Sequence, residues 1–107
     1  MARAKICSGI CGFTATVEAR MDGRRRCFLS IESKCEAIQS LAEELTEVDP
    51  FQEISFRGEG PLTLRLAARH CYHPACPVPV GIIKAIEIAA GLALPTDVSI
   101  TLTESDG

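Results

Sequence analysis

The stretch that decides the fold is Phe13-Thr14-Ala15-Thr16-Val17-Glu18-Ala19, in which apolar and polar residues alternate without interruption. Successive side chains of a β-strand point to opposite faces, so the pattern predicts a strand with its four apolar residues buried. Residues 27–31 repeat the alternation, with Cys27, Leu29 and Ile31 on the apolar side. The two stretches predict an antiparallel hairpin at the centre of a sheet.

The connection between these two strands sets their register. A two-residue turn at Asp22-Gly23 would place the two apolar sets on opposite faces, which a half-buried hairpin does not tolerate. We therefore predict a three-residue loop over residues 21–23, with Gly23 in the left-handed bulge position. The predicted pairs are Val17 with Cys27, Ala15 with Leu29, and Glu18 with Arg26.

Working outward from the hairpin, the pattern predicts one further strand before it, and four helices and a returning strand after it. The predicted elements are a strand over residues 2–7, a helix from a Ser33 to Glu36 capping box to about residue 48, a short helix over 50–56 capped by Asp49, a helix over 62–70, an apolar helix over 79–94 stopped by Pro95, and a strand over 98–102. Strands compete with the helices at residues 54–56 and 62–66. This order, β-β-β-α-α-α-α-β, predicts one α+β domain over residues 1–107, with an antiparallel or mixed sheet of about four strands and helices on one face.

Composition excludes several classes of protein. The chain has 107 residues, of which 47% are hydrophobic and 23% charged, and its net charge of -3 is unlike that of disordered chains or nucleic-acid binders. The run Arg24-Arg25-Arg26 is more typical of a solvated hairpin end than of a phosphate site. No apolar run is long enough to span a membrane, and residues 1–5 lack the apolar core of a secretory signal. We expect a cytoplasmic protein that binds neither nucleic acid nor membrane.

Six cysteines are the main chemical signal. Cytosolic thiols stay reduced, so metal binding or thiol chemistry is a better interpretation than a disulfide framework, whereas export would favour three disulfides. Cys27 lies among inward residues and is predicted to be a core residue. Cys7 could be a ligand with Cys11 in a C-x3-C pattern, or a strand-end residue without a role.

The other four cysteines are predicted to lie in loops or at helix starts. Cys11 stands between two glycines in a loop, and Cys35 falls in the first turn of a helix, where the helix dipole stabilises a thiolate. Cys71 and Cys76 belong to the stretch Cys71-Tyr72-His73-Pro74-Ala75-Cys76-Pro77-Val78-Pro79, just before the apolar helix. We predict a metal site of Cys11, Cys35, Cys71 and Cys76 that binds zinc or an iron–sulfur cluster. His73 could replace one thiolate, and Pro77 after Cys76 is a weak indication of iron.

Three blocks of sequence carry a resemblance to a known family. They are Gly9-Ile10-Cys11-Gly12-Phe13, Ser33-Lys34-Cys35-Glu36-Ala37-Ile38 and the Cys71 to Pro79 stretch, followed by Ile86-Glu87 and Ala90-Gly91-Leu92-Ala93-Leu94-Pro95. The chain resembles, over nearly its whole length, a family of small uncharacterised cysteine-containing proteins from anaerobic bacteria and archaea, a domain of unknown function. The resemblance implies the same four cysteines as its motif positions and leaves Cys7 and Cys27 outside. It implies no activity, and an anaerobic setting would tolerate an oxygen-sensitive cluster.

Two alternatives to the metal site stay open. In the first, the protein is a thiol-redox or thiol-transfer enzyme in which Cys35 or Cys76 is the nucleophile. In the second, it is a structural or interaction domain with inert cysteines, forming a homo-oligomer through the apolar helix 79–94. The sequence names no substrate, no catalytic residue and no protein partner.

Overall fold

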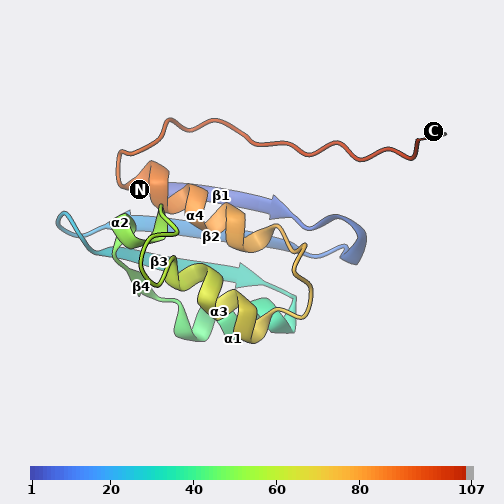
Figure 1. Cartoon of the computed structure of the whole chain (residues 1–107), viewed down its shortest axis with the longest axis horizontal. Coiled ribbons are helices and arrows are strands. Elements are labelled where there is room, and N and C mark those ends of the chain that lie inside the picture. The colour runs from blue at the N-terminus through green and yellow to red at the C-terminus, as the bar shows by residue number, and fades with distance from the viewer. Residues whose placement is uncertain (106–107) are drawn as a thin grey trace.

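The sheet has the strand order β1-β2-β3-β4, and each neighbouring pair is antiparallel. The computed structural model describes residues 1–105, and Figure 1 shows the helices gathered on one side of this sheet. The elements are β1 (Ala2–Cys7), η1 (Gly9–Cys11), β2 (Thr14–Met21), β3 (Cys27–Ser33), α1 (Glu36–Glu44), β4 (Glu47–Val48), α2 (Pro50–Glu53), α3 (Leu62–His70) and α4 (Val78–Ala89). The predicted α+β class is confirmed.

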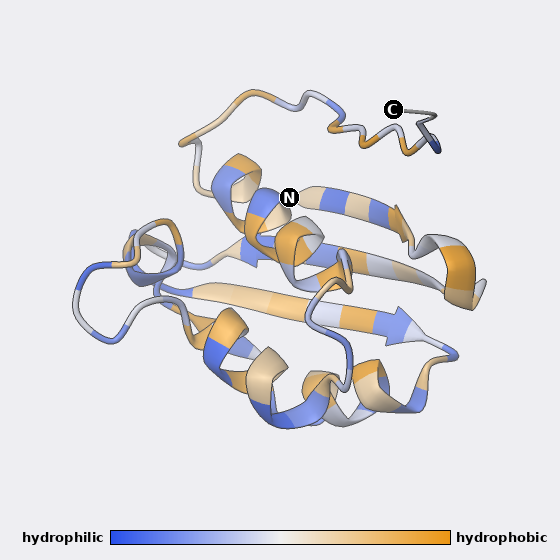
Figure 2. Cartoon of the chain, turned by 45° about the vertical axis from the view of Figure 1, so that its right-hand side comes forward, coloured by the Kyte–Doolittle hydropathy of each residue, from blue (hydrophilic) through white to orange (hydrophobic). Residues whose placement is uncertain are grey.

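The core lies between the sheet and its helices. Helix α4 packs on β1 and β2, α1 packs on β3, and α3 lies against both helices. The side chains that fill this layer alternate along the strands, as the sequence predicted, and Figure 2 shows the same alternation as bands of colour along β1. Among the largest fully buried side chains of the strands and helices are Val17, Cys27, Ile38, Leu41, Leu45, Val78, Ile82 and Ile86.

The predicted register of the β2–β3 hairpin is wrong, although the predicted faces are right. Val17 pairs with Ile31 instead of Cys27, because the loop has five residues and closes with a 2.9 Å bond from Asp22 N to Arg26 O. The shift is an even number of residues, so the apolar sets still share a face. The longer loop also separates the predicted ion pair. Glu18 accepts instead from Arg3 at 2.8 Å, and Arg26 donates to Glu47 at 2.6 Å.

Phe13 also departs from the pattern, since it precedes β2 and is 40% exposed. The capping box is wrong as well. Helix α1 begins at Glu36 with Cys35 as its N-cap, and the Ser33 hydroxyl accepts from the Cys35 amide at 3.2 Å while donating to the Thr14 carbonyl at 2.8 Å. This arrangement ties the start of α1 to the start of β2.

The fourth strand is not where the sequence placed it. Helix α1 ends at Glu44, and the chain then forms β4, which pairs Val48 with Cys27. The predicted strand over residues 98–102 is instead an extended segment outside the sheet. Two residues of β4 are too few for an alternation to be visible, whereas Val98, Ile100 and Leu102 alternate clearly without reaching a partner.

The predicted helix over 50–56 begins at residue 50, as predicted, but ends earlier. Asp49 Oδ1 accepts from the Phe51 amide at 3.0 Å, as an N-cap does. The helix ends at Glu53, whose side chain is 2% exposed and accepts from the amides of Leu62 and Thr63, each at 2.9 Å. The N-cap of α3 is Pro61, which provides no side-chain acceptor. Glu53 therefore caps the confirmed helix α3 from a distance.

Helix α4 is buried along one side and ends at Ala89, five residues before the predicted end at residue 94. Gly91, with φ +74°, ends the helix before Pro95 is reached. Within residues 1–105, each helix is too short or too polar to cross a lipid bilayer.

Candidate functional site

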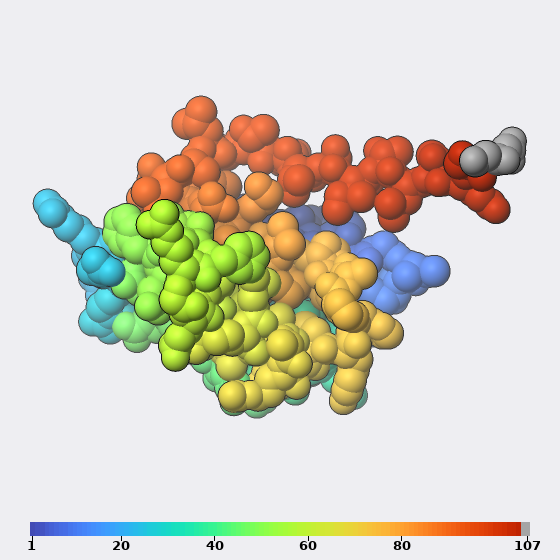
Figure 3. Space-filling view, viewed as in Figure 1, coloured from blue at the N-terminus to red at the C-terminus, as the bar shows by residue number. Residues whose placement is uncertain are grey.

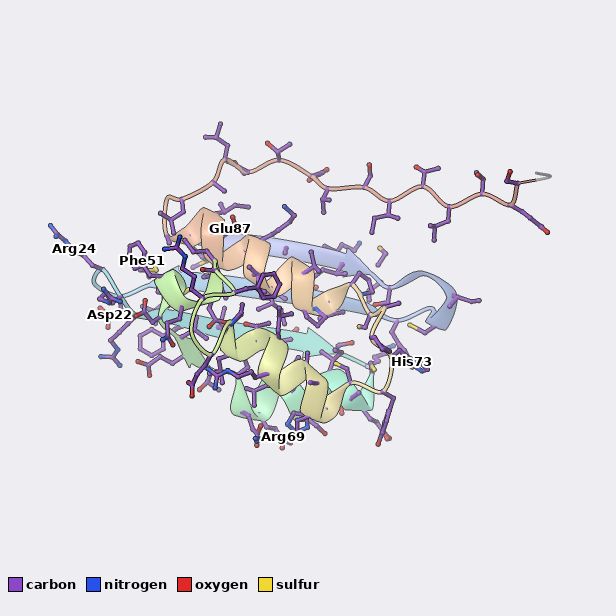
Figure 4. The ribbon with its side chains drawn as sticks, viewed as in Figure 1. Asp22, Arg24, Phe51, Arg69, His73 and Glu87 are labelled. Carbon is purple, nitrogen blue, oxygen red and sulfur yellow. The ribbon has the colours of Figure 1, made fainter. Side chains whose placement is uncertain are left out.

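Six strands and helices end or begin at the same end of the sheet. Strands β1 and β3 and helix α3 end there, and β2, α1 and α4 begin there (Figure 1). Figure 4 labels His73 at this end, and Asp22 and Arg24 at the opposite end. Four of the six cysteines lie in the connections that join these elements, and two helix N-termini face the same region.

Cys35 is held by backbone and hydroxyl contacts. Its carbonyl accepts the amide of Gln39 at 2.9 Å, and its amide donates to Ser33 Oγ. Its thiol makes no capping bond, so the sulfur is available for other contacts while the first-turn amides of α1 lie beside it. The predicted position at the start of a helix is confirmed.

Cys71 and Cys76 are brought together by a tight turn. Cys71 is the C-cap of α3, with its amide bonded to the Ala67 carbonyl at 2.8 Å. The chain reverses through Pro74 and Ala75, and the Cys76 amide donates to the His73 carbonyl at 3.2 Å. Both side chains are partly buried. The turn explains why a spacing of five residues returns the two thiols to one place.

Cys11 lies in the connection between β1 and β2. It is the last residue of η1, a single turn closed by bonds from Gly12 N to Gly9 O at 2.9 Å and from Ser8 N to Phe13 O at 3.0 Å. Gly9 and Gly12 have φ values of +81° and +76°, a conformation that glycine adopts without strain. The Cys11 side chain is exposed.

All four cysteines line one pocket of about 630 Å³, which we call the thiol pocket. Its remaining lining residues are Ser8, Ile10, Phe13, Lys34, Glu36, Ala37, Ile38, Tyr72, His73 and Ala75. A second hollow of about 410 Å³ lies against the other side of the loop and shares Cys71 and Cys76. The loop over residues 71–76 therefore lines both the thiol pocket and this second hollow.

The thiols influence one another. Burial raises the pKa of Cys71 above its ordinary value, and the charges of Cys76 and Cys35 raise it further. Cys71 therefore resists ionisation, and a nearby thiolate makes its deprotonation harder still. Cys11 shares the pocket without taking part in this coupling.

In the part of the chain that the structure describes, residues 1–105, no three His, Cys, Asp or Glu side chains are arranged to hold a metal ion. All six cysteines are free thiols. Cys27 is buried in the core, as predicted, and burial raises its pKa. Cys7 is exposed and does not line the thiol pocket.

The two histidines lie in different surroundings. His73 lines the pocket, whereas His70 contacts Glu44 Oε2 at 2.9 Å on the flank of α1. The sequence reasoning missed the apolar rim of the pocket, made by Ile10, Phe13 and Tyr72, all three exposed. The signal was present in the apolar residues directly beside the loop cysteines.

Fold and pocket together define a small α+β domain with a thiol-lined pocket at one end of its sheet. The model of a family of unknown function (DUF6951) matches residues 2–102, and the chain belongs to this family. The match confirms the expected membership of a family without an assigned role. Searches of the curated proteins and of the solved structures return no match to the chain.

Proposed function

We propose that this protein binds a metal ion or an iron–sulfur cluster in the thiol pocket, with Cys11, Cys35, Cys71 and Cys76 as ligands. The observation that carries the proposal is that these four cysteines, which lie 65 residues apart at the extremes, line a single pocket, while Cys7 and Cys27 lie outside it. Four thiolates are a donor set of zinc and of iron–sulfur centres. The bound group would act in the reducing cytoplasm, where the thiols stay free.

The electrostatics of the group support a cation. A thiol whose pKa is raised by burial and by neighbouring thiolates is a poor nucleophile near neutral pH, which disfavours Cys71 as a redox centre. A bound cation removes this repulsion, because coordination deprotonates a thiol outright. The same feature that weakens catalysis at Cys71 therefore favours coordination.

The thiol pocket has room for a cluster as well as for a single ion. Roughly 10–15 Å³ of such space holds one water molecule, and the pocket offers about 630 Å³. Cys11 stands on the one-turn loop η1, whereas the other three ligands flank α1, α3 and α4, and a bridging group of several atoms could span ligands on these separate elements. A cluster would supply electron transfer or a structural anchor; the protein's part is to position four thiolates and to shield them with apolar side chains.

The test is metal loading of single Cys→Ser variants under anaerobic conditions. Variants at the four ligand positions should each lose at least about tenfold in bound metal or in affinity, since loss of an outer-shell partner alone typically costs that much. Cys7→Ser is the matched control for Cys11→Ser, because both side chains are exposed and only Cys11 lines the pocket. Equal loading of Cys7→Ser and Cys11→Ser, or full loading of every variant, would contradict the proposal.

A second candidate function is thiol redox chemistry, favoured by the proximity of Cys76 to Cys71. In this function an external disulfide of low molecular mass would accept two electrons, while Cys71 and Cys76 form an S–S bond and release two protons. Mass spectrometry of oxidised, metal-free protein distinguishes the candidates. A reversible Cys71–Cys76 disulfide with a defined potential supports redox chemistry, whereas irreversible, mixed disulfides among all six cysteines oppose it.

A further inference from the structure

The C-terminal segment over residues 97–103 has the sequence pattern of a β-strand but lies outside the sheet. Its backbone is extended, and Val98, Ile100 and Leu102 alternate with polar residues. These three side chains are 59%, 75% and 86% exposed. Figure 2 shows the alternation along the segment, and Figure 3 shows the segment projecting from the body of the molecule. Alternating apolar residues are costly to leave in water and are typical of a half-buried strand.

Strand β1 offers a free edge to such a strand. It pairs with β2 on one side, and no other strand among residues 1–105 pairs with its outer side. A free edge presents unpaired N–H and C=O groups that readily accept another extended chain. With six residues, β1 is one residue shorter than the segment. Arg3 and Lys5 on β1 are opposite in sign to Asp97 at one end of the segment and to Glu104 just beyond the other end.

The segment does not use this edge in its own chain. A hollow of about 440 Å³ separates Arg3 to Ile6 of β1 from residues 95–98. Neighbouring strands of a sheet lie about 4.8 Å apart, with no such space between them. The apolar part of this hollow is lined by Ala4, Ile6, Ala85 and Ile88, which leaves a place for apolar side chains on the helix-covered side of β1.

The direction of the segment argues for a second copy as its partner. Figure 1 shows that the segment runs in the same direction as β1, so pairing within one chain would be parallel. The strand pairs of this sheet are antiparallel, and residues such as Arg3, Thr16 and Glu18 make its far face polar, an arrangement typical of purely antiparallel sheets. A second molecule related by a two-fold axis presents its β1 in the opposite direction. Antiparallel pairing is also the more stable of the two.

We propose that residues 97–103 of one molecule pair with the free edge of β1 in a second molecule, and that the exchange is reciprocal, giving a two-fold dimer. Each molecule then donates one strand and accepts one, as an isologous interface requires. Val98, Ile100 and Leu102 cover the hollow beside α4 of the partner. The dimer contact lies on the β1 edge and does not depend on the thiol pocket.

The test combines the measured mass in solution with amide hydrogen exchange. Light scattering across a dilution series should give a dimer for the natural protein, with slow exchange in β1 and in residues 97–103. Ile100→Asp should weaken the dimer by about tenfold or more, since it removes a buried apolar side chain. Phe56→Asp is the matched control, because Phe56 is 83% exposed on the loop between α2 and α3 and belongs to neither β1 nor the segment, and it should leave the dimer unchanged.

Three results would overturn the inference. A monomer with protected amides in residues 97–103 means that the segment docks on its own chain. A monomer with rapid exchange in β1 and in the segment means that the edge stays free. A dimer that persists in Ile100→Asp, and in a chain ending at Leu94, means that another surface mediates association.

Discussion

At the scale of single residues, close contacts fix where the helices sit on the sheet. Gly81 of α4 lies directly over Ile6 of β1, and a Cβ at this position would overlap the Ile6 side chain. Ile6 branches at Cβ and has few rotamers to adopt, so it cannot move aside easily. Gly81 thus allows α4 to approach β1 closely enough to cover the core.

Substitution of Gly81 tests this contact. Helix propensity alone would make Gly81→Ala stabilising by about 1 kcal/mol. We expect the opposite, a loss of about 1–3 kcal/mol, because overpacking forces the helix away from the sheet. Urea unfolding of Gly81→Ala in the natural chain and in an Ile6→Ala background gives the coupling between the two sites. A gain in stability in the natural chain would refute the contact.

Cys71 gives a prediction about pH. Its pKa is raised in the folded, metal-free protein, so folding favours the protonated thiol. The resulting stability is present below the pKa of the unfolded thiol, about 8.5, and is lost as pH rises through the folded pKa. Metal-free, reduced protein should therefore lose stability as the pH rises above about 8.5, measured by urea unfolding. Cys71→Ala should lose less over this range than Cys7→Ala, and identical losses would contradict the assignment.

At the scale of elements, Glu53 links helix α2 to helix α3. Neither helix propensity nor sequence spacing predicts this contact. Its carboxylate accepts two amides of α3 and the Thr63 hydroxyl at 2.6 Å, in a buried setting. Glu53→Ala should destabilise the fold by about 2–3 kcal/mol, since three donors lose a charged acceptor. Glu59→Ala is the control, because Glu59 is exposed and only forms a 3.6 Å pair with Arg65. Equal effects of the two substitutions, measured by thermal unfolding, would show that the cap is unimportant.

The same scale shows how far the sequence could predict the fold. The alternation in β2 and β3 identified the buried faces, because the faces depend only on odd and even positions. It could not fix the register, since a shift of four residues leaves the faces unchanged. The cap at Asp49 and the helix over 62–70 were predictable from local signals. Glu53 was not, because its partners lie nine and ten residues away.

At the scale of the whole molecule, the fold brings four cysteines that are far apart in the sequence to one end of the sheet. The turn through residues 73–76 explains the proximity of Cys71 and Cys76, and this much was visible in the spacing. That Cys11 and Cys35 line the same pocket depends on β1, β2 and β3 being adjacent, which places the η1 loop beside the start of α1. The sequence could predict which cysteines stand in loops, whereas the apolar rim and the second hollow follow only from packing.

Metal content is the most direct test of the central claim. Protein purified without oxygen should contain near-stoichiometric zinc or iron, and iron in a cluster would give a visible absorption spectrum. The loss of metal should follow substitution of Cys11, Cys35, Cys71 or Cys76 and not of Cys7. Protein that contains no zinc or iron, takes up neither when it is offered, and stays fully folded with six reduced thiols would contradict the account.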